Sequence, residues 1–442
     1  MGSPSAPQVL DTVLPCGARL LVESLPGTRT VAIGVWLDVG SRDESESRAG
    51  AAHFVEHLLF KGGAGRDARA LAEAMDRLGG QFNAFTSREH TCFHARTLDQ
   101  HFADGAGLLA EMVLHASLRA PDVERERQVI LAELAMIADD PGETADELFA
   151  RALWGGHPLG RPQAGTVRGV EAFDAADARA FYDEHYVGRR AVIAVAGGVV
   201  PQVAADVVAK AFAGMAPGTP RAPRRPARPA VRRMRLPRRS EQSHLLLGAV
   251  GPALGDARRY AAELLVSILG GSPSSRLFQA VREDRGLCYD VGATPAAYTD
   301  VGEIAVFLAS SPASAREAAA VTLAELRRLA AEGVPAAELA LHRDQLLAGL
   351  WMGLEGAEAR MGRLGRAAVA GLPLVPPEEV ADQLAAVRAD EVAALFVDLG
   401  DPAAWAAAYV GPRRGTPGSW SWEDVAADGP GTPTGQLVPG GA

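Results

Sequence analysis

The chain is poor in cysteine and has no long apolar run. Among its 442 residues are only three cysteines, Cys16, Cys92 and Cys288, which lie far apart and without CxxC spacing. This pattern excludes a disulfide framework and favours a reducing compartment, for which we expect the cytoplasm. The N-terminus lacks a charged start followed by an apolar stretch, so we expect no secretory signal. Apolar runs such as Ala191–Ala196 are far shorter than the ~20 residues of a membrane span, so we expect no membrane partner.

A strong excess of charge of one sign is also missing. The formal net charge of −10 is modest for this length, so we expect no nucleic-acid partner. The apolar fraction of 48% and the charged fraction of 22% are those of a globular protein. The length alone indicates about two to four domains.

One segment, 214–240, differs from the rest in composition. It is dense in proline and carries nine arginines between Arg221 and Arg239. Because proline removes backbone donors and favours extended conformations, we interpret the segment as a semi-rigid linker that acts as a tether. The alternative is an arginine-rich arm that binds nucleic acid. No aromatic residues interleave for base stacking, which disfavours that alternative.

This linker divides the chain into two domains of similar size. We expect an N-terminal domain at 1–213 and a C-terminal domain at 241–411. The remaining residues, 412–442, are rich in glycine and proline, and we expect a flexible tail there.

The two halves repeat one order of elements. Each begins with an apolar strand, continues through two helices and a hairpin to long amphipathic helices, and returns to an apolar strand. In the first half we expect strands at 30–41 and 191–196 and helices at 51–60, 68–78, 121–139 and 174–185. In the second we expect strands at 243–252 and 404–410 and helices at 257–269, 275–282, 313–331 and 335–350. This order predicts an α+β fold, with two homologous α/β-sandwich domains that arose by internal duplication.

The motif His53-Phe54-Val55-Glu56-His57 lies in one of these expected helices. Residues three and four apart share a helix face, so His53, Glu56 and His57 project together. Two imidazoles on one face can bind zinc, and a carboxylate beside them can accept a proton from water. The alternative is a surface helix with two chance histidines. The neighbouring residues are apolar, which indicates a buried helix whose histidines need partners.

A catalytic zinc ion needs a third protein ligand. The expected helix at 121–139 offers candidates, because two carboxylates fall on the face that spacing turns inward. This face comprises Val123, Glu126, Ile130, Glu133 and Ile137. A buried carboxylate is costly without a cation, so we predict Glu133 as the ligand and Glu126 as a group that orients a ligand. In the alternative, both carboxylates are solvated and the core stripe is Val129, Leu131 and Leu134.

These residues resemble the pitrilysin and mitochondrial processing peptidase family of zinc metallopeptidases. The resemblance starts from His53-x-x-Glu56-His57 with Glu133 76 residues after His57. It extends to Gly62-Gly63, where the family commonly has Gly-Thr, and to Leu78-Gly79-Gly80. Further matches are Asn83-Ala84-Phe85-Thr86-Ser87, Ser274-Ser275-Arg276-Leu277-Phe278, Val281-Arg282-Glu283 and Gly286-Leu287-Cys288-Tyr289.

The resemblance implies two homologous α+β domains per chain and one Zn²⁺ per chain. It implies that Arg282 and Tyr289 contact the scissile carbonyl and nearby substrate backbone, where both can donate hydrogen bonds to a developing oxyanion. It also implies that Asn83, Ala84, Phe85 and Thr86 lie on an edge strand that pairs with substrate. The alternatives are a structural arginine, a core tyrosine and an ordinary hairpin strand.

We therefore expect a metalloendopeptidase that cleaves peptides, unfolded segments or leader segments with a metal-activated water. Glu56 is the expected general base. Larger family members hold four such domains in one chain, with the zinc ligands in the first and the Arg–Tyr pair in the last. A two-domain chain is therefore expected to form a homodimer. The alternatives are a heterodimer with a homologous subunit and a non-catalytic structural homologue.

Overall fold

The computed structural model describes residues 9–63 and 65–412, so the expected tail, apart from Pro412, lies outside the described residues. The chain forms two compact units, and each is described by itself. Unit 1 comprises Met1–Ala135, Arg161–Arg225 and Leu350–Pro377. Unit 2 comprises Met136–Gly160, Pro226–Gly349 and Glu378–Ala442.

Unit 1 is built on a six-stranded sheet in the order β1-β2-β6-β3-β5-β4. Its strands are β1 (Val9–Val13), β2 (Arg19–Ser24), β3 (Thr30–Leu37), β4 (Gln81–Thr86), β5 (Thr91–Leu98) and β6 (Ala191–Gly197). The central strands β3 and β6 are continuous apolar runs rich in valine and isoleucine, as expected for strands buried on both faces. Among the strands that the structure describes, β4 pairs only with β5 and therefore lies at a sheet edge.

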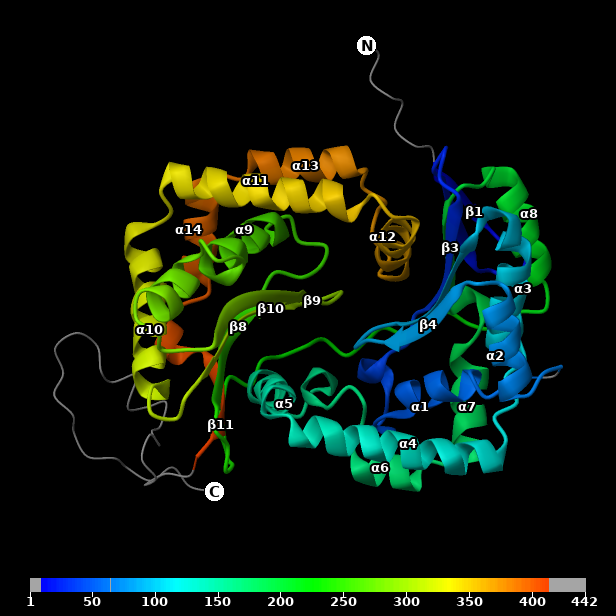
Figure 1. The fold of residues 1–442 in the computed structure, drawn as a ribbon, viewed down its shortest axis with the longest axis horizontal. Coiled ribbons are helices and arrows are strands. Elements are labelled where there is room, and N and C mark those ends of the chain that lie inside the picture. Colours follow the sequence, from blue (N-terminus) through cyan, green and yellow to red (C-terminus); the bar gives the residue numbers. More distant parts are fainter. Residues whose placement is uncertain (1–8, 64, 413–442) are drawn as a thin grey trace, which may run out of the picture. The chain divides into compact units, whose positions relative to one another are not determined.

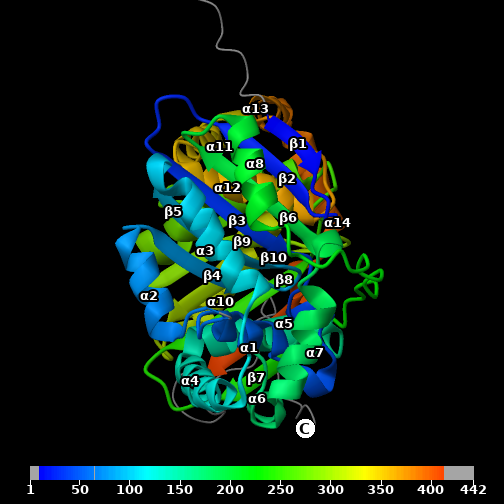
Figure 2. The ribbon, with the colours of Figure 1, turned by 90° about the vertical axis from the view of Figure 1, so that its right-hand side faces the viewer.

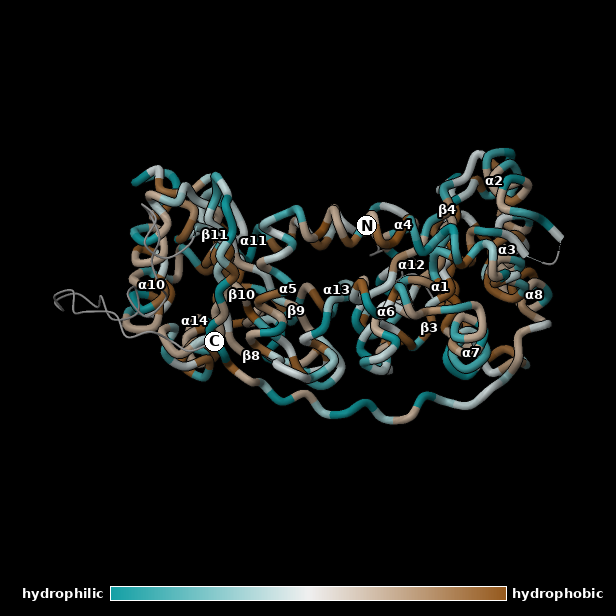
Figure 3. The backbone as a smooth tube through the Cα atoms, turned by 90° about the horizontal axis from the view of Figure 1, so that it is seen from below, coloured by the Kyte–Doolittle hydropathy of each residue, from teal (hydrophilic) through white to brown (hydrophobic). Residues whose placement is uncertain are grey.

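Helices cover both faces of this sheet. They are α1 (Ala51–Leu59), α2 (Ala68–Arg77), α3 (Phe102–Leu114), α4 (Ala120–Asp139), α6 (Val167–Ala172), α7 (Ala175–His185), α8 (Pro201–Ala211) and α12 (Ala357–Val369). One face packs against a layer that includes α1, α3 and α8 (Figure 2). The other face packs against α12 (Figure 1). Along α2 and α3 the chain alternates between hydrophilic and hydrophobic residues, as in amphipathic helices (Figure 3).

Unit 2 is built on a five-stranded sheet in the order β7-β11-β8-β10-β9. Its strands are β7 (Arg233–Pro237), β8 (Ser243–Gly251), β9 (Asp290–Ala297), β10 (Gly302–Ser310) and β11 (Ala406–Gly411). Its helices are α5 (Pro141–Trp154), α9 (Arg259–Gly270), a π-helix at Phe278–Glu283, α10 (Ala315–Glu332), α11 (Ala336–Gly353), α13 (Pro377–Ala386) and α14 (Ala389–Asp398). Helices α4, α11 and α13 each cross a boundary between the units.

The two sheets share one topology, which confirms the predicted fold class. If β1 is set aside, each sheet has its first, fifth, second, fourth and third strands side by side. In each, the first and fifth strands are parallel, β2 with β6 and β7 with β11. Five strands with the same order and direction in two halves of one chain are the expected result of internal duplication.

Each unit contains a helix that comes from the other half of the sequence. Helix α12 comes from the second half of the sequence but packs on the sheet of unit 1, where Met361 and Leu364 meet Trp36 and Ala194 in one buried cluster. Helix α5 comes from the first half but packs on the sheet of unit 2, where Phe149 belongs to a buried cluster with β8 and β11. Each unit is therefore discontinuous in sequence.

The expected elements occur within a few residues of their predicted bounds, with one difference in type. The helix expected at 275–282 is a π-helix at Phe278–Glu283, in which the Asp284 amide donates to the carbonyl of Gln279, 2.9 Å away. Of the expected linker, 214–240, the part Arg233–Pro237 forms β7. Among the described residues, no helix combines the length and apolarity needed to cross a membrane.

Candidate metal centre

Helix α1, which carries the H-x-x-E-H motif, is buried on most of its circumference. The buried residues include Phe54, Val55, Leu58 and Leu59, so the helix is fixed by apolar packing. Its first amides have no cap from the N-cap residue Gly50, which has a positive φ of 104°. The buried carboxylate of Glu44 takes this role, accepting hydrogen bonds from the amides of Gly50 and Ala52, both at 2.7 Å. Glu44 thus satisfies donors that a helix start otherwise leaves unpaired.

The two motif histidines converge with Glu133 of α4. The Nε2 atoms of His53 and His57 lie 3.8 Å and 3.6 Å from Oε2 of Glu133. One ligand atom from each of the three residues fits within 4.8 Å of the others. The structure therefore brings together the three predicted metal ligands from two helices.

Glu126 precedes Glu133 by about two turns of α4. Its Oε2 is 3.2 Å from Nδ1 of His57, and its Oε1 is 2.8 Å from the ammonium of Lys61. The carboxylate is almost fully buried, with 6% of the side chain exposed. If Nδ1 of His57 donates its proton to Glu126, the lone pair of Nε2 faces Glu133. Lys61 compensates the buried charge, a partner that the sequence analysis did not anticipate.

The inward face of α4 follows the predicted stripe in its first half and combines the two stripes in its second half. Val123, Glu126 and Ile130 are buried, and of the alternative stripe Val129 is 44% exposed whereas Leu134 is buried. Glu133 is half-exposed, with 40% of its side chain accessible. A carboxylate buried on one side and open on the other can serve a metal that must also be reached by substrate.

These residues fit a zinc ion. Two imidazole nitrogens and one carboxylate oxygen form a known catalytic zinc set. Ligand bonds of ~2.0–2.1 Å in a tetrahedron separate ligand atoms by about 3.3 Å, close to the distances from Glu133 to His53 and His57. Burial lowers the pKa of His53 to about 4, and the neighbouring His57 contributes in the same direction. His53 is thus neutral at physiological pH, as a ligand must be.

Glu56 lies on the same helix and is held by a residue from the edge strand. Its Oε2 accepts a hydrogen bond of 2.6 Å from the hydroxyl of Thr86, the last residue of β4. Burial raises the pKa of Glu56, and the hydrogen bond from Thr86 opposes that shift. A carboxylate with a raised pKa is a better proton acceptor for general-base chemistry.

The predicted substrate strand is β4, an exposed edge. Asn83 is exposed and its side-chain oxygen accepts a hydrogen bond from the Ala84 amide, while Phe85 is 37% exposed. Thr86 differs from the prediction in its side chain, which is buried and bonded to Glu56. The side chain of Thr86 therefore orients the carboxylate.

The predicted Arg282 and Tyr289 belong to unit 2, whereas the metal ligands belong to unit 1. Both side chains are exposed, Tyr289 to 58%. Arg282 lies on the π-helix, with its guanidinium 4.8 Å from the ring centre of Phe278. Rare π-helical turns are frequent at functional sites.

Three residues of the site escaped the sequence analysis: Glu44, Lys61 and, in its observed role, Thr86. Spacing along one helix reveals the motif because its members are three and four residues apart. Glu44 and Thr86 reach α1 from neighbouring loops and strands, a proximity that no local pattern encodes. The one signal in the sequence was glycine at position 50, which has no side chain to cap α1 and so indicates that another residue must do so.

Comparison with known proteins gives a consistent family signal. Residues 19–167 match the family described as insulinase (peptidase family M16). Residues 172–346 match the family described as the peptidase M16 inactive domain. All of the predicted metal ligands lie in the first match, and no second H-x-x-E-H motif occurs in the second.

Several relatives are similar over most of their length. An uncharacterized zinc protease of Mycobacterium tuberculosis is 40% identical over 360 residues, covering 80% of this chain and 82% of the relative. An uncharacterized zinc protease of Streptomyces coelicolor is 37% identical, covering 88% and 87%. One from Bacillus subtilis is 33% identical, covering 87% and 93%.

Two solved structures share the fold. A peptidase M16 inactive domain from Pseudomonas fluorescens superposes with a TM-score of 0.86 at 22% identity, covering 92% of this chain and 98% of that one. A protease from Helicobacter pylori superposes with a TM-score of 0.84 at 20% identity, covering 92% and 100%.

Proposed function

The chain belongs to peptidase family M16, and from this premise we propose that it is a zinc-dependent endopeptidase for peptides or for unfolded and leader segments. The observation that carries this proposal is the convergence of His53, His57 and Glu133, with Glu56 held beside them by Thr86. The names of the relatives, zinc proteases, support the same chemistry.

His53 and His57 would hold one zinc ion through their Nε2 atoms and Glu133 through a carboxylate oxygen. When bound, zinc supplies a Lewis acid that lowers the pKa of a water molecule and polarises a carbonyl group. Glu126 keeps His57 in the tautomer and orientation that ligation requires. The half-exposed Glu133 leaves the site open on one side.

The protein's own residues account for the proton transfers. Glu56 accepts a proton from the attacking water and later donates it to the leaving amine. Thr86 keeps one carboxylate oxygen of Glu56 engaged, so the other is free to meet the water. By the family resemblance, Arg282 and Tyr289 donate hydrogen bonds to the oxyanion and the substrate backbone.

An extended peptide is the substrate that the edge strand β4 suits. Because β4 pairs only with β5 among the described strands, its other side presents backbone donors and acceptors to an added strand, apart from the Thr86 carbonyl, which accepts from the side-chain amide of Gln163. The amide of Ala84 bonds to the side chain of Asn83 rather than within the ladder, which supports an outward direction for it. Since Thr86 ends this strand, a peptide paired with β4 would run toward Glu56.

A two-domain chain is proposed to work as a homodimer, as the family resemblance implies. In this arrangement Arg282 and Tyr289 of one chain serve the metal centre of its partner, because the larger relatives supply the two sets from different domains. A heterodimer with a homologous subunit is the alternative. Three free, buried cysteines support a reducing compartment, for which we propose the cytoplasm.

Metal analysis tests the ligand assignment. We expect about one zinc ion per chain after purification, and His53→Ala or Glu133→Ala should remove most of it. His115→Ala, at an exposed histidine, serves as the matched control and should keep wild-type zinc content. Equal zinc in the wild type and both ligand variants would contradict the assignment.

A further inference from the structure

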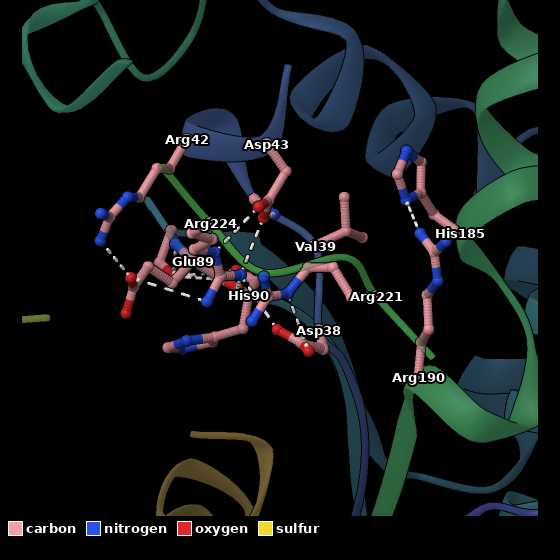
Figure 4. Close-up of polar contacts among 12 residues, drawn as sticks. Asp38, Val39, Arg42, Asp43, Glu89, His90, His185, Arg190, Arg221 and Arg224 are labelled. Carbon is pink, nitrogen blue, oxygen red and sulfur yellow. Dashed lines mark hydrogen bonds and ion pairs between the residues drawn. The ribbon is translucent and has the colours of Figure 1, made fainter. Parts of the chain in front are cut away.

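The arginine-rich segment after α8 is bound to unit 1 at its first arginines. The guanidinium of Arg224 donates to both carboxylate oxygens of Asp43 at 2.8 Å, to Oδ1 of Asp38 at 3.0 Å and to the carbonyl of Glu89 at 2.6 Å. Arg221 donates to Oδ2 of Asp38 at 3.0 Å. Figure 4 shows Arg224 surrounded by these groups. Only 7% of the Arg224 side chain is exposed.

These acidic residues come from two neighbouring loops. Asp38 and Asp43 lie in loop 38–44, which follows β3, and Glu89 lies in turn 87–90 between β4 and β5. A second arginine of the same cluster, Arg42, donates to Oε1 of Glu89 at 2.6 Å and to the carbonyl of Arg225 at 3.0 Å. Arg42, Arg221 and Arg224 thus contact Asp38, Asp43 and Glu89 in a largely buried cluster of opposite charges.

The two loops are also joined directly. The amides of Ser41 and Arg42 donate to the carbonyls of Ser87 and Arg88 at 3.1 Å and 2.8 Å. A Cβ atom at Gly40 would lie only 2.4 Å from the carbonyl oxygen of Ser87, so the loops leave no room for a side chain there. Arg224 spans the two loops at this junction.

Each of the two loops is adjacent in sequence to a residue that forms hydrogen bonds to α1, the helix that carries the H-x-x-E-H motif. In loop 38–44, Asp43 is followed by Glu44, whose carboxylate caps the start of α1. Before turn 87–90, Ser87 is preceded by Thr86, whose hydroxyl binds Glu56. A displacement of either loop would therefore move a direct partner of α1 or of the general base.

We propose that Arg224 is a positioning residue, and that 221–225 is a clasp that fixes the two loops carrying Glu44 and Thr86 rather than a passive tether. The expected loss of turnover rests on the proposed peptidase function, whereas the positioning of the two loops by Arg224 does not. The tether interpretation predicts that replacing the arginines of the linker leaves cleavage unchanged. The contacts of Arg224 predict a loss of turnover from that one residue.

The matched comparison is Arg224→Gln against Arg228→Gln. Arg228 belongs to the same segment and is exposed, so its replacement makes the same chemical change outside the cluster. In Arg224→Gln we expect kcat to fall about 10- to 100-fold with KM within about threefold, since small misplacements of catalytic groups are costly. Arg228→Gln should match the wild type. Arg224→Lys keeps the positive charge but lacks the several planar donors of the guanidinium, and should recover part of the lost kcat.

Hydrogen exchange followed by mass spectrometry gives a readout that does not depend on cleavage. Exchange should rise in 38–52 and 84–90 of Arg224→Gln and remain unchanged in Arg228→Gln. If Arg224→Gln does not fold, the double variant Arg224→Gln with Asp43→Asn removes both charges of the Arg224–Asp43 pair and leaves less unpaired charge. It should fold and still show reduced kcat.

Wild-type kcat and wild-type exchange in a folded Arg224→Gln, or wild-type kcat in the double variant, would overturn the proposal. Failure of the peptidase function itself looks different, because the wild-type protein would then cleave nothing. The exchange measurement would still decide whether Arg224 fixes the two loops.

Discussion

At the scale of single residues, the site depends on side chains that hold other side chains. Glu126 fixes His57, Lys61 neutralises Glu126, and Thr86 fixes Glu56. Buried polar groups of this kind need every partner, because an unpaired one carries the full cost of its desolvation. Replacement of a supporting residue should therefore affect turnover while the residues of the motif remain intact.

Thr86 offers the clearest case among the supporting residues. Thr86→Val keeps the shape of the side chain but removes the hydroxyl that binds Glu56. We expect kcat to fall about tenfold or more, because a hydrogen bond to a charged group contributes about 1.5–3 kcal/mol. Thr86→Ser retains the hydroxyl and should recover most of the activity. Equal kcat in the valine and serine variants, both with bound zinc, would show that this hydrogen bond has no role in turnover.

At the scale of elements, Thr86 joins the edge strand β4, the proposed substrate strand, to Glu56 beside the metal centre. The amide of Ser87 donates to the carbonyl of His90 at the turn. Because hydrogen-bonded and non-bonded pairs alternate in an antiparallel ladder, the amides of Ala84 and Thr86 point away from β5. The backbone groups on this side of β4 therefore recur at every second residue. Of these, the Ala84 amide donates to Oδ1 of Asn83 and the Thr86 carbonyl accepts from Nε2 of Gln163.

This alternation makes a testable prediction for substrates. In a peptide that the protein cleaves, N-methylation of a backbone amide that faces β4 should lower kcat/KM about tenfold or more, because a donor is lost and a methyl group is inserted. Methylation of the adjacent amide, which points the other way, should have little effect and is the matched control. Effects that do not alternate along the peptide would argue against pairing with β4.

Much of the element order follows from local sequence patterns, whereas the exchange of helices does not. Strands β3 and β8 begin at their predicted first residues, and α1 is placed correctly by its apolar spacing. Helices α5 and α12 are amphipathic, which predicts a buried face but not which sheet covers it. Only long-range packing decides that α12 lies against Trp36 of β3.

The candidate site likewise contains residues that local sequence patterns predict and residues that only long-range contacts bring together. His53, Glu56, His57 and the two glutamates of α4 follow from helical spacing. The contacts of Glu44, Thr86 and Arg224 do not, because each joins segments that are distant in sequence or separated by a loop. The arginines of 221–239 look alike by composition, yet the structure buries Arg224 in a cluster and leaves Arg228 exposed.

At the scale of the whole molecule, the two sets of proposed catalytic groups belong to different units. The metal ligands lie in unit 1, and Arg282 and Tyr289 lie in unit 2. The proposed homodimer assigns the pair of one chain to the metal centre of the other. Such a dimer with twofold symmetry would contain two equivalent composite sites.

Complementation tests that assignment. Glu56→Gln and Tyr289→Phe homodimers should each be nearly inactive. After mixing and subunit exchange, a shared site should restore up to about half of the wild-type activity per heterodimer, because one of its two sites has both groups intact. If the groups act within one chain, no intact site exists in the heterodimer. Absence of recovery with subunit exchange confirmed would contradict the shared-site dimer.

The central claim, peptide hydrolysis that depends on Glu56 beside a zinc site, is tested most directly by Glu56→Gln. Zinc content and the products of a peptide library, identified by mass spectrometry, should be measured on the same preparations of wild type and variant. The amide keeps the shape of the side chain but cannot accept the proton. We predict equal zinc content and a rate of cleavage lower by several orders of magnitude, on the order of 10²–10⁴-fold. Cleavage at the wild-type rate by the zinc-loaded variant would contradict the account.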